Sequence, residues 1–461
     1  MKTIFFTIYD GDTEKVNLRS DVFPTLKRAG LKIIILVKRK FVDYYRANFG
    51  DSRVLIEPLP NARAFSERVF YWLGWNTIPT FSIYLRRKEA YLKHHRNFIR
   101  YRVEQVVSFF GRFRLWRNFL RWIYFHISDD YGKELFQKYK PDLLFAPSMF
   151  SFEDGRLLRQ AKKLGIKTIT TVKSWDVLTT KAFTRVLADK ILVFNEYNKR
   201  EAIEIGDYKP EQVEVVGFPQ FDIYTKKEIF LSRKEFFKKI GANLNKKLIL
   251  YASSGGWKNP YEHEVLLGLH KAIEDGRIKE PIQVLIRFHP KYSSPAEYLK
   301  GLPHFILDRP GTHLIKETDL SFGEATDRVF NWTFTEKDII NLANSIYHSD
   351  VTINTQSTMT LDAAALDKPV ILIGYDGFRK LDYWQSILRK YERNHYQYVL
   401  KTGGVRLVKS LDELIETINA YLENPNLDSG GRKIVREKLI YKVDGNSGKR
   451  VAEIILNFIN K

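Results

Sequence analysis

The apolar segments of this chain occur in two series, in each of which short strand-like runs alternate with amphipathic helical patterns. In the first series we predict strands at 3–9, 32–37, 142–146, 167–172, 190–194 and 213–216, and helices at 19–29, 153–164 and 199–205. In the second we predict strands at 247–252, 283–288, 351–354 and 370–373, and helices at 262–275, 336–348, 357–365, 411–422 and 451–459. Alternation of this kind is typical of parallel sheets covered by helices on both faces. The sequence therefore predicts an α/β protein with two doubly wound, Rossmann-like domains.

A charged stretch at residues 226–239 separates the two series and marks the predicted domain boundary. A chain of 461 residues is long enough for two or three domains. We assign residues 1–230 to the first domain and 231–445 to the second, with a final helix in 446–461 that can cross back to the first. Doubly wound sheets bind ligands beyond the carboxyl ends of their strands. We therefore expect the two domains to face each other across a ligand-binding cleft.

Residues 63–127 interrupt the first series with a dense mixture of cations and aromatic rings. This segment holds 13 Lys or Arg against three Glu, and 18 aromatic residues that include Trp72, Trp75, Trp116 and Trp122. Such a mixture suits an anionic membrane surface. We predict a helical insertion in the first domain that docks on this kind of surface. The alternatives are an insertion with packed aromatics and solvated arginines, or contact with nucleic acid, for which no accompanying motif is present.

The chain has no cysteine, and its formal net charge is +21. Disulfides, thiolate metal sites and cysteine nucleophiles are therefore excluded, which fits a reducing compartment. The longest uncharged stretch, residues 69–85, contains Gly74, Asn76 and Pro79, so a membrane-spanning helix is not expected. We predict a cytoplasmic protein that lies peripherally on the cytoplasmic face of the membrane.

The junction after the predicted strand 351–354 is rich in short hydroxyl side chains. Ser357 or Thr358 can cap the helix that begins there. The unpaired backbone N–H groups and the dipole at a helix start favour an anion such as a phosphate. An ordinary N-cap without a ligand is the alternative.

Two more segments follow predicted strands of the second domain. In Arg287-Phe288-His289-Pro290-Lys291, the basic side chains could face a negatively charged ligand, and a turn set by Pro290 is the alternative. In Ser253-Ser254-Gly255-Gly256-Trp257, the two glycines Gly255 and Gly256 permit close approach of a ligand to the backbone. This segment matches neither GxGxxG nor GxxxxGK[ST], so neither a dinucleotide fingerprint nor a P-loop is indicated.

In the first domain, polar residues also follow predicted strands. Asp10, Asp12 and Glu14 lie in a segment predicted to be a polar loop, where Asp10 or Asp12 could serve as a catalytic base for an acceptor hydroxyl. A solvated loop without a catalytic role is the alternative. Other candidates for the acceptor side or the cleft, together with Glu14, are Trp175, Asp176 and Asp222. No metal-ligand spacing such as HExxH or an EF-hand loop is present, and no GxSxG motif.

Together these segments resemble the glycosyltransferase-B superfamily, and within it bacterial surface-polysaccharide transferases and CDP-glycerol glycerophosphotransferases. In the latter, a strand ends in Arg-x-His-Pro, as residues 287–290 do here. Ser357, Thr358 and Asp362 match a Ser, Ser and Asp that precede a Lys-Pro-Val strand, found here at 368–370. Thr355 and Gln356 stand where that family has Asp and Tyr, so the resemblance leaves the glycerol-phosphate donor open.

The resemblance implies a transferase that needs neither metal nor cofactor. It would move a sugar, or a sugar or polyol phosphate, from a nucleotide-diphosphate donor to a glycan or lipid-linked acceptor in surface-glycan synthesis. The second domain would hold the donor at Ser357 and Thr358, with Arg287, Gly255 and Gly256 nearby and Asp362 close to the nucleotide or the donor hydroxyls. His289 would contact the donor phosphate and stabilise the leaving group. The first domain would bind the acceptor.

Two other functions remain open at this stage. A nucleotide-sugar 2-epimerase has the same architecture, although it has no need of a lipid-facing surface. A degenerate transferase fold could also serve as a binding protein for membranes or nucleic acid. Retention of Arg287, His289, Ser357 and Thr358 argues against degeneration.

Overall fold

The chain divides into two compact units, each built on one parallel sheet. The structure is a computed structural model, and it describes residues 1–60, 64–92, 97–181, 183–255, 259–290, 296–313 and 332–461. One unit comprises Met1–Gln220 together with Asn446–Lys461, and the other comprises Phe221–Gly445. In the described part, no helix is long and apolar enough to cross a membrane.

The first unit contains a seven-stranded sheet in which each strand runs parallel to its neighbours. In spatial order the strands are β3 (Val54–Leu59), β2 (Lys32–Lys38), β1 (Thr3–Ile8), β4 (Leu143–Ala146), β5 (Lys167–Thr171), β6 (Lys190–Val193) and β7 (Val213–Val215). The order reverses between β1 and β4, and this is the switch point of a doubly wound sheet. Strands such as β1 read as continuous apolar runs because helices cover both faces of the sheet and leave every side chain buried.

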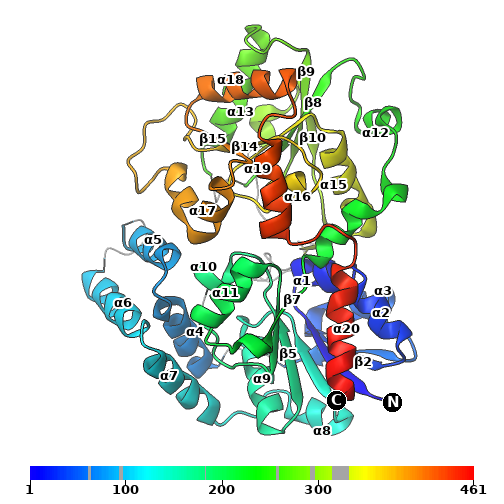
Figure 1. Cartoon of the computed structure of the whole chain (residues 1–461), viewed down its shortest axis with the longest axis vertical. Helices are drawn as coiled ribbons and strands as arrows, with labels where there is room; N and C mark the ends of the chain where they lie inside the picture. The colour runs from blue at the N-terminus through cyan, green and yellow to red at the C-terminus, as the bar shows by residue number, and fades with distance from the viewer. Residues whose placement is uncertain (61–63, 93–96, 182, 256–258, 291–295, 314–331) are drawn as a thin grey trace. The chain divides into compact units, whose positions relative to one another are not determined.

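Helices of the first unit cover this sheet and extend to one side of it. They are α1 (Gly11–Asn17), α2 (Val22–Arg28), α3 (Val42–Phe49), α4 (Phe65–Thr77), α5 (Phe81–Ala90), α6 (Phe98–Phe110), α7 (Arg114–His126), α8 (Lys133–Tyr139), α9 (Phe152–Lys163), α10 (Val177–Thr180), α11 (Glu196–Glu204) and α20 (Ser447–Asn460). The C-terminal helix α20 lies beside α2 (Figure 1). It is held there in part by Arg450, which donates a hydrogen bond to the carbonyl of Val216 at 2.9 Å.

The second unit contains a six-stranded parallel sheet. In spatial order its strands are β10 (Phe305–Asp308), β9 (Ile282–Arg287), β8 (Lys247–Ala252), β13 (Val351–Asn354), β14 (Val370–Ile373) and β15 (Arg406–Val408). The strand order reverses between β8 and β13. The accompanying helices are α12 (Arg233–Ile240), α13 (Glu262–Glu274), α15 (Glu336–His348), α16 (Met359–Ala365), α17 (Asn394–Leu400), α18 (Leu411–Glu423) and α19 (Ser429–Ile434). A short antiparallel pair, β11 (Thr312–His313) with β12 (Trp332–Thr333), lies outside the main sheet.

The basic aromatic segment is helical where it is described, and α4–α7 gather at one side of the first unit (Figure 1). Glu67 on α4 is fully buried and accepts hydrogen bonds from the Tyr124 hydroxyl at 2.9 Å and from Arg185 at 2.9 Å. A buried carboxylate needs such partners, because desolvation without them is costly. These contacts join α4 and α7 to the body of the unit.

Candidate active site

Three segments singled out in the sequence meet at the carboxyl edge of the second sheet. Strand β8 pairs with β13 so that Ala252 lies opposite Asn354, and it pairs with β9 so that Ala252 lies opposite Arg287. The residues that follow these strands, near Ser253, Ser357 and His289, therefore emerge side by side at the switch point. Since neighbouring strands lie about 4.8 Å apart, the ends of β9 and β13 are separated by about 10 Å. That span suits a ligand with a diphosphate group.

The buried acid Glu262, at the start of α13, supports the loop after β8 through hydrogen bonds. Its carboxylate accepts hydrogen bonds from the Ser253 hydroxyl at 2.5 Å and from the Ser254 amide at 2.9 Å. Burial raises the pKa of the Glu262 carboxyl. Gly255 has φ +78, a left-handed conformation that favours glycine, and Gly256 lies outside the described residues. The role of Glu262 could not be predicted from the sequence, because an acid in the first turn of a helix is common.

The junction between β13 and α16 is organised by Asn354, the last residue of the strand. The Asn354 side-chain oxygen accepts hydrogen bonds from the Ser357 amide at 3.2 Å and from the Thr360 hydroxyl at 3.1 Å. The Ser357 hydroxyl accepts from the Met359 amide at 3.3 Å, whereas the Thr358 side chain makes no capping bond. An Asn at the end of a strand, three residues before Ser357, is a sequence signal that could have predicted this turn.

The structure corrects the expectation of several unpaired amides at this helix start. The Gln356 amide donates to the Tyr391 hydroxyl at 3.2 Å, and the amides of Ser357, Met359 and Thr360 donate within the junction itself. Most of the backbone donors are therefore already used. A phosphate at this position would depend on the hydroxyl groups and on the local field more than on a row of open N–H groups.

Arg287 and His289 occupy different environments. Arg287 is buried, and its guanidinium pairs with Asp308 on the neighbouring strand β10 and donates to the carbonyl of Asp338 at 3.4 Å. Arg287 therefore joins β9, β10 and α15. This structural role differs from the ligand contact that we expected. His289 is partly exposed just beyond the strand end. Lys291 lies outside the described residues.

Asp362 lies on α16 and is buried. Its carboxylate accepts a hydrogen bond from the Tyr224 hydroxyl at 2.5 Å. Burial and the Asp362 charge raise the pKa of Tyr224 well above its usual value, so the phenol stays protonated as a donor. The contact fastens α16 to the 3₁₀ turn Pro219–Thr225, which the sequence analysis did not anticipate.

In the first unit, the acidic segment after β1 forms the short helix α1, where a polar loop was expected. Asp10 caps it by accepting from the Thr13 amide at 2.9 Å, with Thr13 bonding back in a capping box. Lys173, which follows β5, pairs with Asp10 and lies 3.6 Å from Asp12. Burial alone would lower the pKa of the Lys173 ammonium, but Asp10 and Asp12 outweigh it and raise that pKa. Asp10 is thus engaged as a cap and ion-pair partner, and Asp12 is the more exposed of the two acids.

The remaining first-domain candidates differ in exposure. Glu14 is fully buried, and pairs with Arg19 at 2.8 Å. Trp175 is buried, and Asp176 is half-buried and accepts from the Thr180 hydroxyl at 2.9 Å. Asp222 is buried and belongs to the second unit. Of the three candidates in the first unit, Glu14 and Trp175 are buried, and only Asp176 has a partly accessible side chain.

The helices α6 and α7 expose a continuous row of aromatic rings, which we call the aromatic strip. Neighbouring ring centroids lie 5.7–6.4 Å apart. The strip consists of Phe109, Phe110, Phe113, Trp116, Phe119 and Trp122. All of its members are exposed except Trp116, which is half-buried, and Trp122 is 59% exposed. Exposed apolar patches of this kind mark interaction surfaces.

The expectation for the tryptophans and arginines of this segment needs correction in part. Trp72 donates to Glu104 at 3.2 Å, and Trp75 is covered by Arg86, so neither is an exposed anchor. Arg117 and Arg121 are buried and pair with Asp207. Arg102 and Arg112 are exposed. The outward cations are therefore fewer than the sequence count suggested.

Residues 160–457 match the family described as CDP-Glycerol:Poly(glycerophosphate) glycerophosphotransferase. The matched range includes the whole carboxyl edge of the second sheet. No curated protein matches the sequence.

Solved structures with this fold cover almost the entire chain at low identity. MnaA of S. aureus with UDP has a TM-score of 0.57 at 14% identity, over 100% of this chain and 97% of that one. The UDP-GlcNAc 2-epimerase from Neisseria meningitidis bound to UDP-GlcNAc has a TM-score of 0.56 at 13% identity, over 99% and 100%. The wall teichoic acid polymerase TagF, in a structure with CDPG, has a TM-score of 0.50 at 12% identity, over 100% and 88%. These likenesses confirm the glycosyltransferase-B fold expected from the sequence.

Proposed function

The chain belongs to the CDP-glycerol:poly(glycerophosphate) glycerophosphotransferase family, and we propose that it moves a sugar, or a sugar or polyol phosphate, from a nucleotide-diphosphate donor to a glycan or lipid-linked acceptor. The observation that carries this proposal is the convergence of His289, the Ser253–Gly255 loop and the Ser357–Thr358 junction at one sheet edge. Each segment follows a strand next to the switch point, where doubly wound sheets bind ligands.

In this proposal, the donor diphosphate lies between His289 and the hydroxyl junction. The Thr358 side chain, which makes no capping bond, supplies a hydroxyl donor to a phosphate oxygen. His289 donates to the phosphate oxygen on which charge develops as the bond to the transferred group breaks. Hydrogen-bond donors placed where charge develops lower the barrier. Glu262 and Asn354 act as positioning residues that hold the two loops.

For the acceptor we propose the carboxyl edge of the first sheet, with Asp12 as the base. Asp12 is 38% exposed in its side chain and lies 3.6 Å from the Lys173 ammonium. Asp10 caps α1 and pairs with the same lysine, so its role is to position Lys173 and the start of α1. A base must reach the acceptor hydroxyl directly or through one water, and the partly exposed Asp12 meets this condition better than the buried Asp10.

We further propose that the aromatic strip docks on the anionic cytoplasmic face of a membrane, where a lipid-linked acceptor would be found. The flanking cations support this choice. Exposed Arg102 and Arg112 lie over the rings of Phe98 and Phe109, whereas Glu104 of α6 is buried. The surface of α6 and α7 thus presents rings and positive charge, and the one acid of these two helices, Glu104, is buried. That combination suits reversible binding to anionic lipid.

A direct test is product formation from candidate donors. Purified protein is incubated with CDP-glycerol, UDP-GlcNAc or related nucleotide donors, with and without a lipid-linked acceptor. The proposal expects release of the nucleotide only when acceptor is present. Conversion of a nucleotide sugar to its 2-epimer without acceptor would contradict it and favour epimerase activity, which the solved neighbours MnaA and UDP-GlcNAc 2-epimerase make the natural rival.

A further inference from the structure

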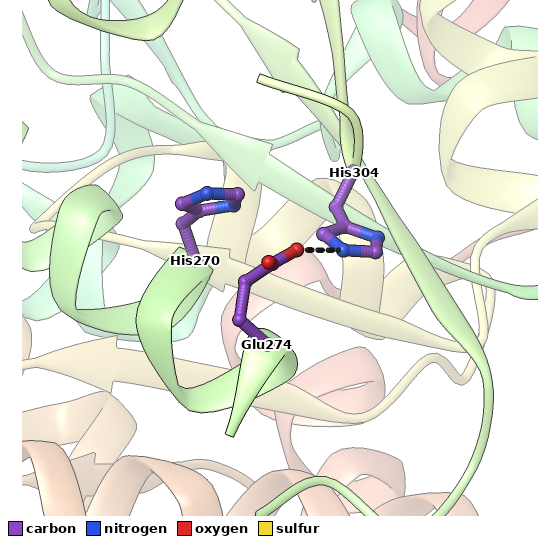
Figure 2. A group of neighbouring side chains, drawn as sticks. All are labelled: His270, Glu274 and His304. Carbon is purple, nitrogen blue, oxygen red and sulfur yellow. Dashed lines mark hydrogen bonds and ion pairs between the residues drawn. The ribbon is translucent and has the colours of Figure 1, made fainter. Parts of the chain in front are cut away.

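Three side chains with metal-ligating atoms meet at the amino edge of the second sheet. His270 and Glu274 lie one turn apart on α13, and His304 immediately precedes β10. One ligand atom from each residue lies within 4.8 Å of the other two. Figure 2 shows the three side chains converging from the helix and from the neighbouring segment.

This cluster is separate from the proposed donor site. Helix α13 begins at Glu262, which supports the carboxyl-edge loop, and His270 lies eight residues further along. Eight residues of α-helix span about 12 Å. The carbonyl of His304 accepts a hydrogen bond from the Val284 amide at 2.8 Å, near the start of β9. The cluster therefore lies at the opposite end of the strands from His289 and Ser357.

Within the cluster, His304 contacts Glu274, and one nitrogen of each histidine has no hydrogen-bond partner among the described residues. His304 Nε2 lies 2.7 Å from Glu274 Oε1, and the rings of His270 and His304 have centroids 5.7 Å apart. The Nδ1 atoms of both His270 and His304 are buried and have no hydrogen-bond partner among the described residues. Buried polar atoms in folded proteins almost always have a partner. The unpartnered Nδ1 atom of His270, beside the contact between His304 and Glu274, points to a missing ligand.

We propose that His270, Glu274 and His304 bind one divalent transition-metal ion of the zinc type. Two imidazoles and one carboxylate form a ligand set that zinc uses, with the fourth position left to water. Imidazole ligands disfavour Mg²⁺ and Ca²⁺, which prefer oxygen. The ion would join α13 to the segment before the edge strand β10, and it takes no part in the proposed transfer because it lies at the opposite end of the strands from His289 and Ser357.

To hold the ion, the ligand atoms, which lie within 4.8 Å of one another, must adopt the spacing of a metal site. Metal–ligand bonds of about 2.0–2.1 Å in a tetrahedron place ligand atoms about 3.3 Å apart. The 2.7 Å contact between Glu274 and His304 fits a shared proton, so the ion replaces that proton and the two atoms separate by about 0.6 Å. The Glu274 side chain is 51% exposed and can move by this amount. Since metal and proton compete for the same nitrogens, binding weakens in acid.

Calorimetric titration of the full chain with Zn²⁺ tests the proposal. For this titration, the protein is prepared without a polyhistidine tag and is first treated with a chelator, so that no other metal site or bound metal contributes heat. At pH about 7.5, we expect one site in the micromolar range, no heat with Mg²⁺, and a rise in melting temperature on the order of 5 °C at a 100-fold excess over Kd. His270→Gln and His304→Gln should each weaken binding about tenfold or more.

A control from the same helix sharpens the result. His263 is half-buried on α13, and its ring stacks on Tyr298 at 5.3 Å instead of on a second histidine. His263→Gln should leave Zn²⁺ affinity unchanged. If a cluster variant misfolds, visible absorption of Co²⁺ bound to the wild-type protein reports directly whether the ion has nitrogen ligands in low coordination. Failure of the wild-type protein to bind Zn²⁺, or equal binding by all three variants, would overturn the proposal.

Discussion

Arg117 donates two hydrogen bonds to Asp207, at 2.8 and 2.6 Å, and so fastens α7 to the turn that follows α11. Arg121 joins the same carboxylate at 2.7 Å. All three side chains are buried. One acid thus pairs with two buried arginines of the segment 63–127, whose cations were expected to face an anionic surface.

Replacement of Asp207 by Asn should therefore destabilise the first unit strongly. Asn is among the few residues that tolerate the left-handed φ of +65 at this position, so the variant tests the charge alone. Removing one partner of a buried ion pair costs about 3–5 kcal/mol, measured as the loss of unfolding free energy in urea. Asp43→Asn is the control, because its pair with Arg46 is exposed and should be worth less than about 1 kcal/mol.

The same carboxylate predicts acid lability. Burial alone would raise the pKa of Asp207, but Arg117 and Arg121 outweigh burial and lower that pKa. A pKa depressed by folding gives stability that is present above the unfolded value of about 4 and is lost as pH falls through the folded value. Urea midpoints should fall more steeply below about pH 4 in the wild-type protein than in Asp207→Asn. Parallel pH profiles would mean that Asp207 is not the group responsible.

His289→Ala should reduce turnover by about 10²–10³-fold and change the melting temperature little, because the side chain is partly exposed. His348 provides the opposite case. It is buried, stacks on Phe236 and bonds the carbonyl of Leu231 at 2.8 Å. His348→Ala should lower the melting temperature while activity per folded molecule is retained. A reversed pattern in the two variants would assign His289 a structural role.

Thr358→Glu should weaken nucleotide-diphosphate binding by at least about tenfold, because a carboxylate beside a phosphate is repulsive. Thr358→Gln is the matched control, since it has nearly the same shape as Glu without the charge. Calorimetry with CDP and UDP provides the measurement. Equal affinity in the Glu and Gln variants would place the phosphates elsewhere.

Membrane docking should depend on both rings and cations of the aromatic strip. Each cation near an anionic leaflet contributes about 1 kcal/mol, so Arg102→Glu with Arg112→Glu should lower vesicle partitioning at least about 30-fold. Phe113→Glu with Trp122→Glu should also abolish flotation with anionic vesicles. Leu164→Glu is the control, because Leu164 is a similarly exposed apolar side chain in the same unit. Wild-type protein that fails to float with anionic vesicles at low salt would refute docking.

Strands buried on both faces could be predicted from the sequence almost to the residue. The strands at 351–354 and 370–373 have the expected bounds, because each is a short apolar run between polar residues. The edge strands β3, β10 and β15 were missed, and β3 contains Glu57 and Pro58 within its apolar run. Edge strands are half-buried, and β15 is only three residues long and begins with Arg406, so their apolar signal is weak.

Candidate site residues could be predicted where a polar side chain directly follows a strand, and their supporting partners could not be predicted where these come from far away in the sequence. Ser357 and His289 lie next to strand ends in sequence as well as in space. The supports of the site, such as Tyr224 for Asp362, act over 138 residues. The short helix α1 was predicted to be a loop because it has no apolar period. It depends instead on the capping box of Asp10 and Thr13.

Helix α20 belongs to the first unit although it comes last in the chain. On the ribosome, the segment that covers α2 leaves the exit tunnel only after the whole second unit has been made. The second unit is contiguous and can fold as soon as it emerges. The two units can therefore finish folding in the reverse of their order of translation, because the unit that is translated first is the last to be completed.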